Sequence, residues 1–128
     1  MKHELIPVNN LDVQFEVNER MDIPPVSFSF RHSEHSFMRS AQRGIEKTKI
    51  MAALQYGEVI YKQGLLYHIL GEKDIPAHLL KFRDSIKDTV VIVSGRSNQI
   101  ITCYRRRRPF KYIRNKSKQL FKGLKEAA

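Results

Sequence analysis

The sequence predicts an α+β domain in which two N-terminal helices pack on a four-stranded antiparallel sheet. Apolar residues recur at helical spacing between about residues 33 and 56, and four segments rich in β-branched and aromatic residues follow between 59 and 104. Helices grouped before strands indicate an α+β arrangement, because parallel βαβ units alternate the two. The 128 residues suit one domain, and the 41% apolar content suits one core.

We expect residues 1–30 to form an N-terminal extension to this domain. Apolar residues alternate with polar ones over residues 11–18, which predicts a half-buried strand. Pro24 and Pro25 interrupt the alternation, and residues 26–30 then predict a second short extended piece. The α+β domain itself is predicted over residues 31–106, followed by a basic tail over 107–128.

Two helices are predicted next. Ser33 suits an N-cap, Glu34 suits the first turn of a helix, and Gly44 is a natural stop. A second helix is predicted from roughly Lys47 to Tyr56, with an apolar stripe on one side.

The remaining residues predict strands and a final helix. Lys62-Gln63-Gly64 predicts a hairpin turn, and Pro76 predicts the start of a short helix. After Pro109, basic and apolar residues mix in a pattern that predicts an amphipathic helix to the C-terminus. The four predicted strands cover residues 59–61, 65–70, 89–93 and 99–104.

Positive charge is concentrated in the last quarter of the chain. Residues 1–102 carry thirteen Lys or Arg and twelve Asp or Glu, whereas residues 103–128 carry ten Lys or Arg and one acid, Glu126. This asymmetry indicates a polyanionic partner, RNA in the first place. The alternative is a solvated basic tail that only aids solubility.

Composition excludes several classes of protein. No apolar run approaches the roughly 20 residues of a membrane helix, and the N-terminal residues do not resemble a secretory signal. Cys103 is the single cysteine, so neither an intrachain disulfide nor a cysteine metal cluster is expected. His32 and His35 lack the third and fourth ligands of a zinc site. We expect a cytoplasmic protein that uses no metal and no cofactor.

His35, Arg39 and Arg43 have the spacing i, i+4, i+8, which places them on one stripe of the first predicted helix. Guanidinium groups can grip phosphate oxygens, and an imidazole can move a proton near neutral pH. The pattern therefore suits phosphate chemistry. The alternative is a solvated polar face that carries a histidine by chance.

Three runs of sequence resemble a small bacterial family of unknown function related to the RelE-like (barnase–colicin–RelE) ribonuclease toxin fold. They are His35 to Ile45, Gly57 to Ile60, and Ile100 to Arg105. The resemblance covers about residues 31–106. This chain departs from the family at Ser36, where members usually carry alanine, and it adds the extension and the tail. The resemblance implies two helices packed on an antiparallel sheet.

The resemblance also implies RNA binding and a metal-independent endoribonuclease of the toxin type, in which the RNA 2′-hydroxyl attacks the adjacent phosphate. His35 would be the acid or base, while Arg39, Arg43 and Arg105 would hold phosphate. Tyr104 would donate a hydrogen bond or stack on a base. Two alternatives stay open: a non-catalytic nucleic-acid or ribosome-binding module, and an interaction protein that docks an acidic partner such as an antitoxin.

The tail mixes cations with aromatic residues, which suits RNA phosphates and bases. The same pattern would also fit an anionic membrane surface, which we rank lower, or an acidic protein. Among the other histidines, His32 is the reserve catalytic candidate, His68 is expected to be structural, and His78 is expected on a surface loop. The predicted nucleic-acid-binding residues are Arg106, Arg107, Arg108, Lys111, Tyr112 and Arg114.

Overall fold

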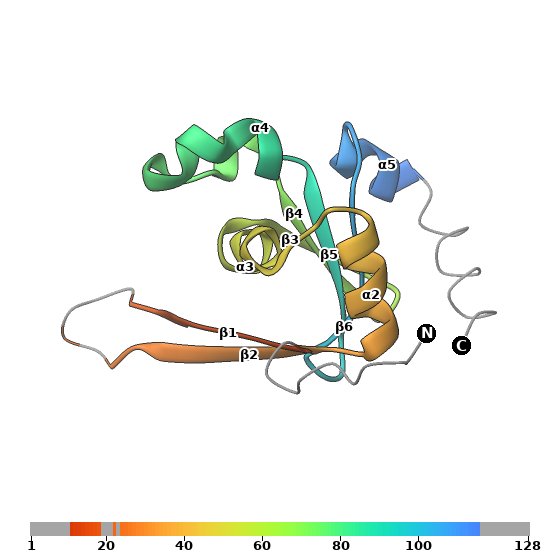
Figure 1. The fold of residues 1–128 in the computed structure, drawn as a ribbon, viewed down its shortest axis with the longest axis horizontal. Helices are drawn as coiled ribbons and strands as arrows, with labels where there is room; N and C mark the ends of the chain where they lie inside the picture. Colours follow the sequence, from red (N-terminus) through yellow and green to blue (C-terminus); the bar gives the residue numbers. More distant parts are fainter. Residues whose placement is uncertain (1–10, 19–21, 23, 116–128) are drawn as a thin grey trace, which may run out of the picture.

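A computed structural model describes residues 11–18, 22 and 24–115. Its strands are β1 (Asp12–Val17), β2 (Val26–His32), β3 (Glu58–Lys62), β4 (Leu65–Leu70), β5 (Thr89–Ser94) and β6 (Gln99–Arg105). Its α-helices are α2 (Glu34–Gln42), α3 (Lys47–Tyr56), α4 (Arg83–Ile86) and α5 (Pro109–Asn115), with 3₁₀ turns η1 (Glu72–Asp74) and η2 (Ala77–Phe82). The fold is α+β, and the strands form one curved, mixed sheet in the order β1-β2-β6-β5-β4-β3 (Figure 1).

The predicted four-stranded antiparallel sheet with two N-terminal helices packed on it is wrong. Two strands, β1 and β2, precede the helices and extend the sheet to six strands. Strand β2 runs parallel to β6, with Arg31 opposite Gln99 and His32 opposite Ile100. This contact joins residues far apart in the sequence through only two pairs, so no local pattern specifies it. The other strand pairs of the sheet are antiparallel.

The β1–β2 hairpin extends away from the rest of the molecule (Figure 1). The Phe15 ring stacks on Phe28 at 5.6 Å and on Phe30 at 6.1 Å between centroids. Near the base of the hairpin, Arg31 donates to the carboxylate of Asp12 at 2.6 Å. The alternation predicted for residues 11–18 and 26–30 thus forms a hairpin that pairs with the sheet through β2.

Helix α2 begins as the sequence predicts. The Ser33 side chain accepts a hydrogen bond from the Ser36 amide at 3.1 Å, which caps the first turn. The buried residues of α2 are Ser36 and Ser40, and the helix packs chiefly on β6. Small side chains at these positions let the helix backbone approach the strand closely. Gly44 then ends the helical segment with φ of 72°, a left-handed conformation that favours glycine.

Strands β3 to β6 form the predicted meander. Gln63 and Gly64, both with positive φ, make the turn between β3 and β4. The segment between β4 and β5 holds η1, η2 and α4, where the sequence predicts only one short helix after Pro76. The Thr89 hydroxyl donates to the carbonyl of Ile86 at 2.6 Å and ties α4 to the start of β5.

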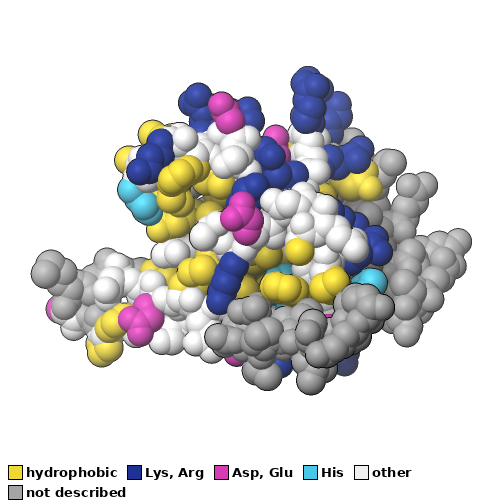
Figure 2. Space-filling model, in the orientation of Figure 1, with side chains coloured by type: hydrophobic (Ala, Val, Ile, Leu, Met, Phe, Trp, Pro, Cys, Tyr) yellow, Lys and Arg dark blue, Asp and Glu magenta, His cyan; other side chains and the backbone are white. Residues whose placement is uncertain are grey.

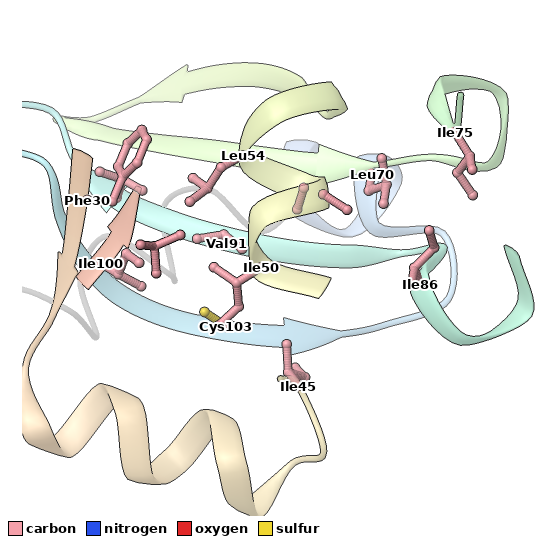
Figure 3. Close-up of a cluster of buried hydrophobic side chains, with 14 residues drawn as sticks. Phe30, Ile45, Ile50, Leu54, Leu70, Ile75, Ile86, Val91, Ile100 and Cys103 are labelled. Atoms are coloured by element: carbon pink, nitrogen blue, oxygen red, sulfur yellow. The ribbon is translucent and has the colours of Figure 1, made fainter. Parts of the chain in front are cut away.

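Buried apolar side chains form two clusters, one on each side of the sheet. The larger lies between the sheet and α3, where side chains of α3 such as Ile50 and Leu54 meet those of the strands, such as Val91 and Ile100 (Figure 3). The smaller joins Tyr67 and other residues of β4 and β5 to Ile113 of α5. Helix α5 is the described part of the predicted C-terminal helix. The remainder of that prediction, residues 116–128, lies outside the described residues.

Candidate nucleic-acid interface

A cavity of about 550 Å³ lies where β6 ends, between the C-terminal end of α2 and helix α5. Thr102 and Tyr104, two residues apart on β6, both line it, as the alternation of side chains along a strand predicts. Among the described residues, the lining is dominated by cationic and aromatic side chains and includes no His, Asp or Glu. The lining residues are Arg43, Ile92, Thr102, Tyr104, Arg105, Arg106 and Tyr112.

Arg43 lies beside the part of β6 that has no strand partner on its β2 side among the described residues. Strand β2 pairs with β6 at Gln99 and Ile100, and helix α2 packs on β6. The Arg43 Nη1 atom donates to the Cys103 carbonyl at 2.8 Å and to Thr102 Oγ1 at 3.1 Å. Arg43 therefore satisfies an exposed strand edge, while its side chain stays exposed to solvent.

Arg105 is likewise held by backbone carbonyls. Its Nε atom donates to the Lys87 carbonyl at 3.1 Å and its Nη2 atom donates to the Asp84 carbonyl at 3.0 Å. These bonds satisfy carbonyls at and just after the end of α4, where helical backbone lacks partners. Arg105 thus contributes positive charge to the rim of the cavity, with two of its donor atoms already engaged.

Arg106 lies on an aromatic ring. Its guanidinium carbon is 3.6 Å from the centre of the Tyr112 ring, a cation–π arrangement. Arg114 lies 5.8 Å from the centre of the Phe110 ring on the same helix. Cations and flat aromatic faces therefore alternate over this end of the molecule.

Tyr104 and Tyr112 line the cavity, and Tyr67 lies close to them. Burial raises the pKa of Tyr104, and the nearby Tyr112 and Tyr67 phenols raise it further, while Arg106 lowers it. The pKa of Tyr67 is also raised, first by burial and then by Tyr112. The buried Tyr104 hydroxyl has no hydrogen-bond partner among the described residues. It stays protonated at neutral pH and is available as a hydrogen-bond donor.

His35 and Arg39 do not line this cavity. Both are exposed on α2, and neither side chain makes a hydrogen bond or ion pair within the described residues. His35 precedes Arg43 by eight residues, which corresponds to about 12 Å along a helix axis. The structure thus brings Arg43, Tyr104 and Arg105 together at the cavity. His35 and Arg39 lie on α2 outside the cavity, toward the N-terminal end of the helix.

The other predicted nucleic-acid-binding residues surround the same end. Arg107 and Arg108 are exposed and line a second cavity, of about 460 Å³, together with Asp88 and Phe110. Lys111 and Arg114 are exposed on α5, whose Ile113 is buried. Dark blue Lys and Arg side chains gather over α4 and α5 on the face shown in Figure 2.

The docking of α5 on the sheet is a feature that sequence reasoning missed. Lys62 of β3 donates to the carbonyls of Ile113 and Arg114 at 3.3 and 3.1 Å, which satisfies the end of the helix. Ile113 belongs to the smaller apolar cluster, and Phe110 packs against that cluster. Their i, i+3 spacing is the sequence signal that predicts a buried face for this helix.

The remaining histidines divide between core and surface. His32, the reserve candidate, is buried and its Nδ1 atom bonds the Ser36 hydroxyl at 2.9 Å. His68 is buried, both of its ring nitrogens lack partners among the described residues, and burial lowers its pKa to about 4. His78 is exposed, with its ring against Tyr56.

Within residues 11–18, 22 and 24–115, no group of three or more His, Cys, Asp or Glu is placed to hold a metal ion. No helix in that part of the chain has the length and apolar character needed to cross a membrane. No protein-family model, no curated protein and no solved structure matches this chain.

Proposed function

We propose that the protein binds RNA on the surface formed by the end of β6 and by α5. The observation that carries this proposal is the β6 cavity, in which arginines and tyrosines converge and Arg106 stacks on Tyr112. Proteins hold RNA through cationic contacts to phosphates and through stacking of unpaired bases on aromatic rings and guanidinium planes. Both kinds of group occur here side by side, with Arg107 and Arg108 exposed nearby.

The geometry supports binding more strongly than cleavage. RNA cleavage by attack of the 2′-hydroxyl requires a group that takes up a proton near neutral pH. The described residues that line the cavity include no histidine or carboxylate, and the Tyr104 phenol is held in its protonated form. His35 is accessible to solvent, but it does not line the cavity that Tyr104 and Arg105 line.

The proposal is tested by fluorescence anisotropy with a labelled single-stranded RNA over a series of salt concentrations. The double variant Arg107→Ala/Arg108→Ala should weaken binding and reduce the slope of log K against log salt by about 1.4, since each phosphate contact contributes about 0.7 for a single strand. The control Lys81→Ala/Arg96→Ala removes the same charge from exposed positions away from the cavity. Equal loss in both variants, or no affinity at low salt, would contradict the proposal.

Incubation of the same RNA with the protein and with His35→Ala, both in chelator, tests the rival hypothesis of a ribonuclease. We expect the RNA to remain intact with both proteins. Fragments that appear with the unsubstituted protein and disappear with His35→Ala would overturn this expectation and assign catalysis to His35.

A further inference from the structure

The β6 cavity has the size of a small-molecule site, and its polar side chains are mostly hydrogen-bond donors. Its volume of about 550 Å³ lies within the range of such sites, which is about 300–1,000 Å³. Guanidinium groups donate hydrogen bonds and never accept them. Among the described residues, the lining includes the guanidiniums of Arg43, Arg105 and Arg106 and no carboxylate or imidazole. The cavity therefore suits a ligand edge that is rich in acceptors.

These guanidiniums keep N–H groups that bonds within the described part of the chain do not use. Arg43 donates through Nη1 to Thr102 Oγ1 and to the Cys103 carbonyl, which leaves its Nε and Nη2 atoms for a ligand. Arg105 donates through Nε and Nη2 to two backbone carbonyls, which leaves Nη1. The Arg106 guanidinium makes no hydrogen bond or ion pair among the described residues. Each arginine can therefore still donate to a ligand.

Tyr104 adds a buried donor whose hydrogen bond is unmade. Its side chain lines the cavity, and its buried hydroxyl has no partner among the described residues. Buried polar groups in folded proteins nearly always have a partner, so this hydroxyl indicates one that comes from outside the protein. The phenol oxygen shares a lone pair with the ring, which makes the group a better donor than acceptor. The missing partner is therefore an acceptor, such as a carbonyl oxygen.

Arg106 supplies a flat surface at the same cavity. Its guanidinium carbon lies 3.6 Å from the centre of the Tyr112 ring, and its side chain is exposed to solvent. Unpaired RNA bases stack on guanidinium planes as they do on aromatic rings. A base that stacks on Arg106 would form the third layer on the guanidinium and the Tyr112 ring. The cavity thus combines a stacking surface with donors, the two features that a base-recognition site needs.

We propose that the β6 cavity takes up one unpaired base of the bound RNA and selects uracil and guanine over cytosine and adenine, an inference that rests on the proposed RNA binding. Uracil and guanine carry a carbonyl oxygen where cytosine and adenine carry an amino group. The carbonyl would accept from the Tyr104 hydroxyl and from a free arginine N–H, while the base stacks on Arg106. An amino group at the same position would place a donor against donors, which is unfavourable.

Fluorescence anisotropy of the full chain tests this selection with labelled RNA strands that each carry a single base. Each strand has about ten nucleotides, within the span of single-strand sites, and all but the central one are abasic. The central base is uracil, cytosine, adenine or hypoxanthine, which is guanine without its 2-amino group. Stacking between neighbouring bases is thereby removed. We expect uracil to bind about tenfold more tightly than cytosine, and hypoxanthine about tenfold more tightly than adenine.

Substitutions locate the effect. Tyr104→Phe removes only a hydroxyl that has no partner in the described protein, so it should fold normally and reduce each preference from about tenfold to about twofold. Tyr61→Phe, on an exposed residue of β3 outside the lining, is its control. Arg106→Lys keeps the charge but loses the flat plane. It should weaken all the base-bearing strands by about fivefold, while the preferences and the affinity of a wholly abasic strand stay unchanged.

A parallel titration with an ordinary single-stranded RNA of mixed sequence separates this inference from the proposed function. If that RNA binds but the members of each pair bind equally, or the amino bases bind more tightly, base selection is overturned and RNA binding stands. A preference that Tyr104→Phe leaves at about tenfold also overturns the inference, because the buried hydroxyl would then have no part in it. If the mixed RNA does not bind at low salt, the proposed function fails, and base selection fails with it.

Discussion

The N-terminal hairpin and the C-terminal basic segment join the same sheet in different ways. Residues 12–32 join it through strand pairing, reinforced by a stack of aromatic rings. Residues 103–115 continue from β6 into a short helix that is held by the fully buried Ile113 and by Lys62. The hairpin contributes to the core on the α3 side, whereas α5 contributes to the core on the opposite side.

The two regions also differ in charge. The described part of the hairpin carries the acids Asp12, Glu16 and Asp22, with Arg31 as its one cation. Residues 103–115 carry six Lys or Arg and no acid. The space-filling view shows acidic and apolar side chains on the hairpin and blue side chains over α4 and α5 (Figure 2). The two regions therefore differ in charge although both pack on the sheet. The basic segment is not a separate tail outside the core.

The largest expected effect comes from removing the anchor of α5. Ile113→Ala should lower the free energy of unfolding by about 3 kcal/mol, because it deletes buried methyl groups and leaves a cavity. Urea denaturation measures this loss. Lys111→Ala, on an exposed position of the same helix, should change stability by less than about 0.5 kcal/mol. A loss below about 1 kcal/mol for Ile113→Ala would mean that α5 contributes little to the core.

The next largest expected effect is a loss of stability in acid, which arises from His68 beside the Phe30 ring of the hairpin. His68 is 8% exposed and contacts the Phe30 ring edge-on at 6.1 Å, and burial lowers its pKa to about 4. The unfolded chain binds this proton near pH 6.5 and the folded chain only near pH 4, so stability is full above pH 6.5 and falls as pH drops toward 4. The expected loss is about 3 kcal/mol.

Urea denaturation at pH 7.0 and at pH 4.0 measures this dependence. His68→Leu should remove most of it, because leucine does not titrate. His78→Ala changes an exposed histidine and should leave it intact. An equal pH dependence in protein with and without His68→Leu would assign the acid sensitivity to other groups.

The smallest expected effect concerns the exposed half of the aromatic stack. Phe28→Ala should lower stability by about 1 kcal/mol, because the Phe28 ring is 39% exposed and stacks on Phe15. Val26→Ala on the same strand is the control, because Val26 is 51% exposed and contributes no ring to the aromatic stack. Thermal unfolding of both variants measures the difference. Equal shifts in Tm would show that the stack does not stabilise the hairpin.

Local patterns predicted many elements of this chain correctly. The second helix, predicted from roughly Lys47 to Tyr56, and the strand at residues 65–70 have the predicted bounds, and Ser33 caps α2 as expected. Thr102 and Tyr104 share a strand face, as predicted. Caps, turns and periodicity depend on residues within one or two turns of each other, so the sequence itself contains the necessary information.

The sequence by itself therefore determined where most of the helices and strands form and where positive charge is concentrated. Only the tertiary structure decided that β2 pairs with β6, that α5 closes the far face of the sheet, and that Arg43 and Tyr104 share a cavity from which His35 is separate. These features depend on packing between residues far apart in the chain. Strand pairing and helix docking are set by the fit of whole surfaces, and no local pattern specifies that fit.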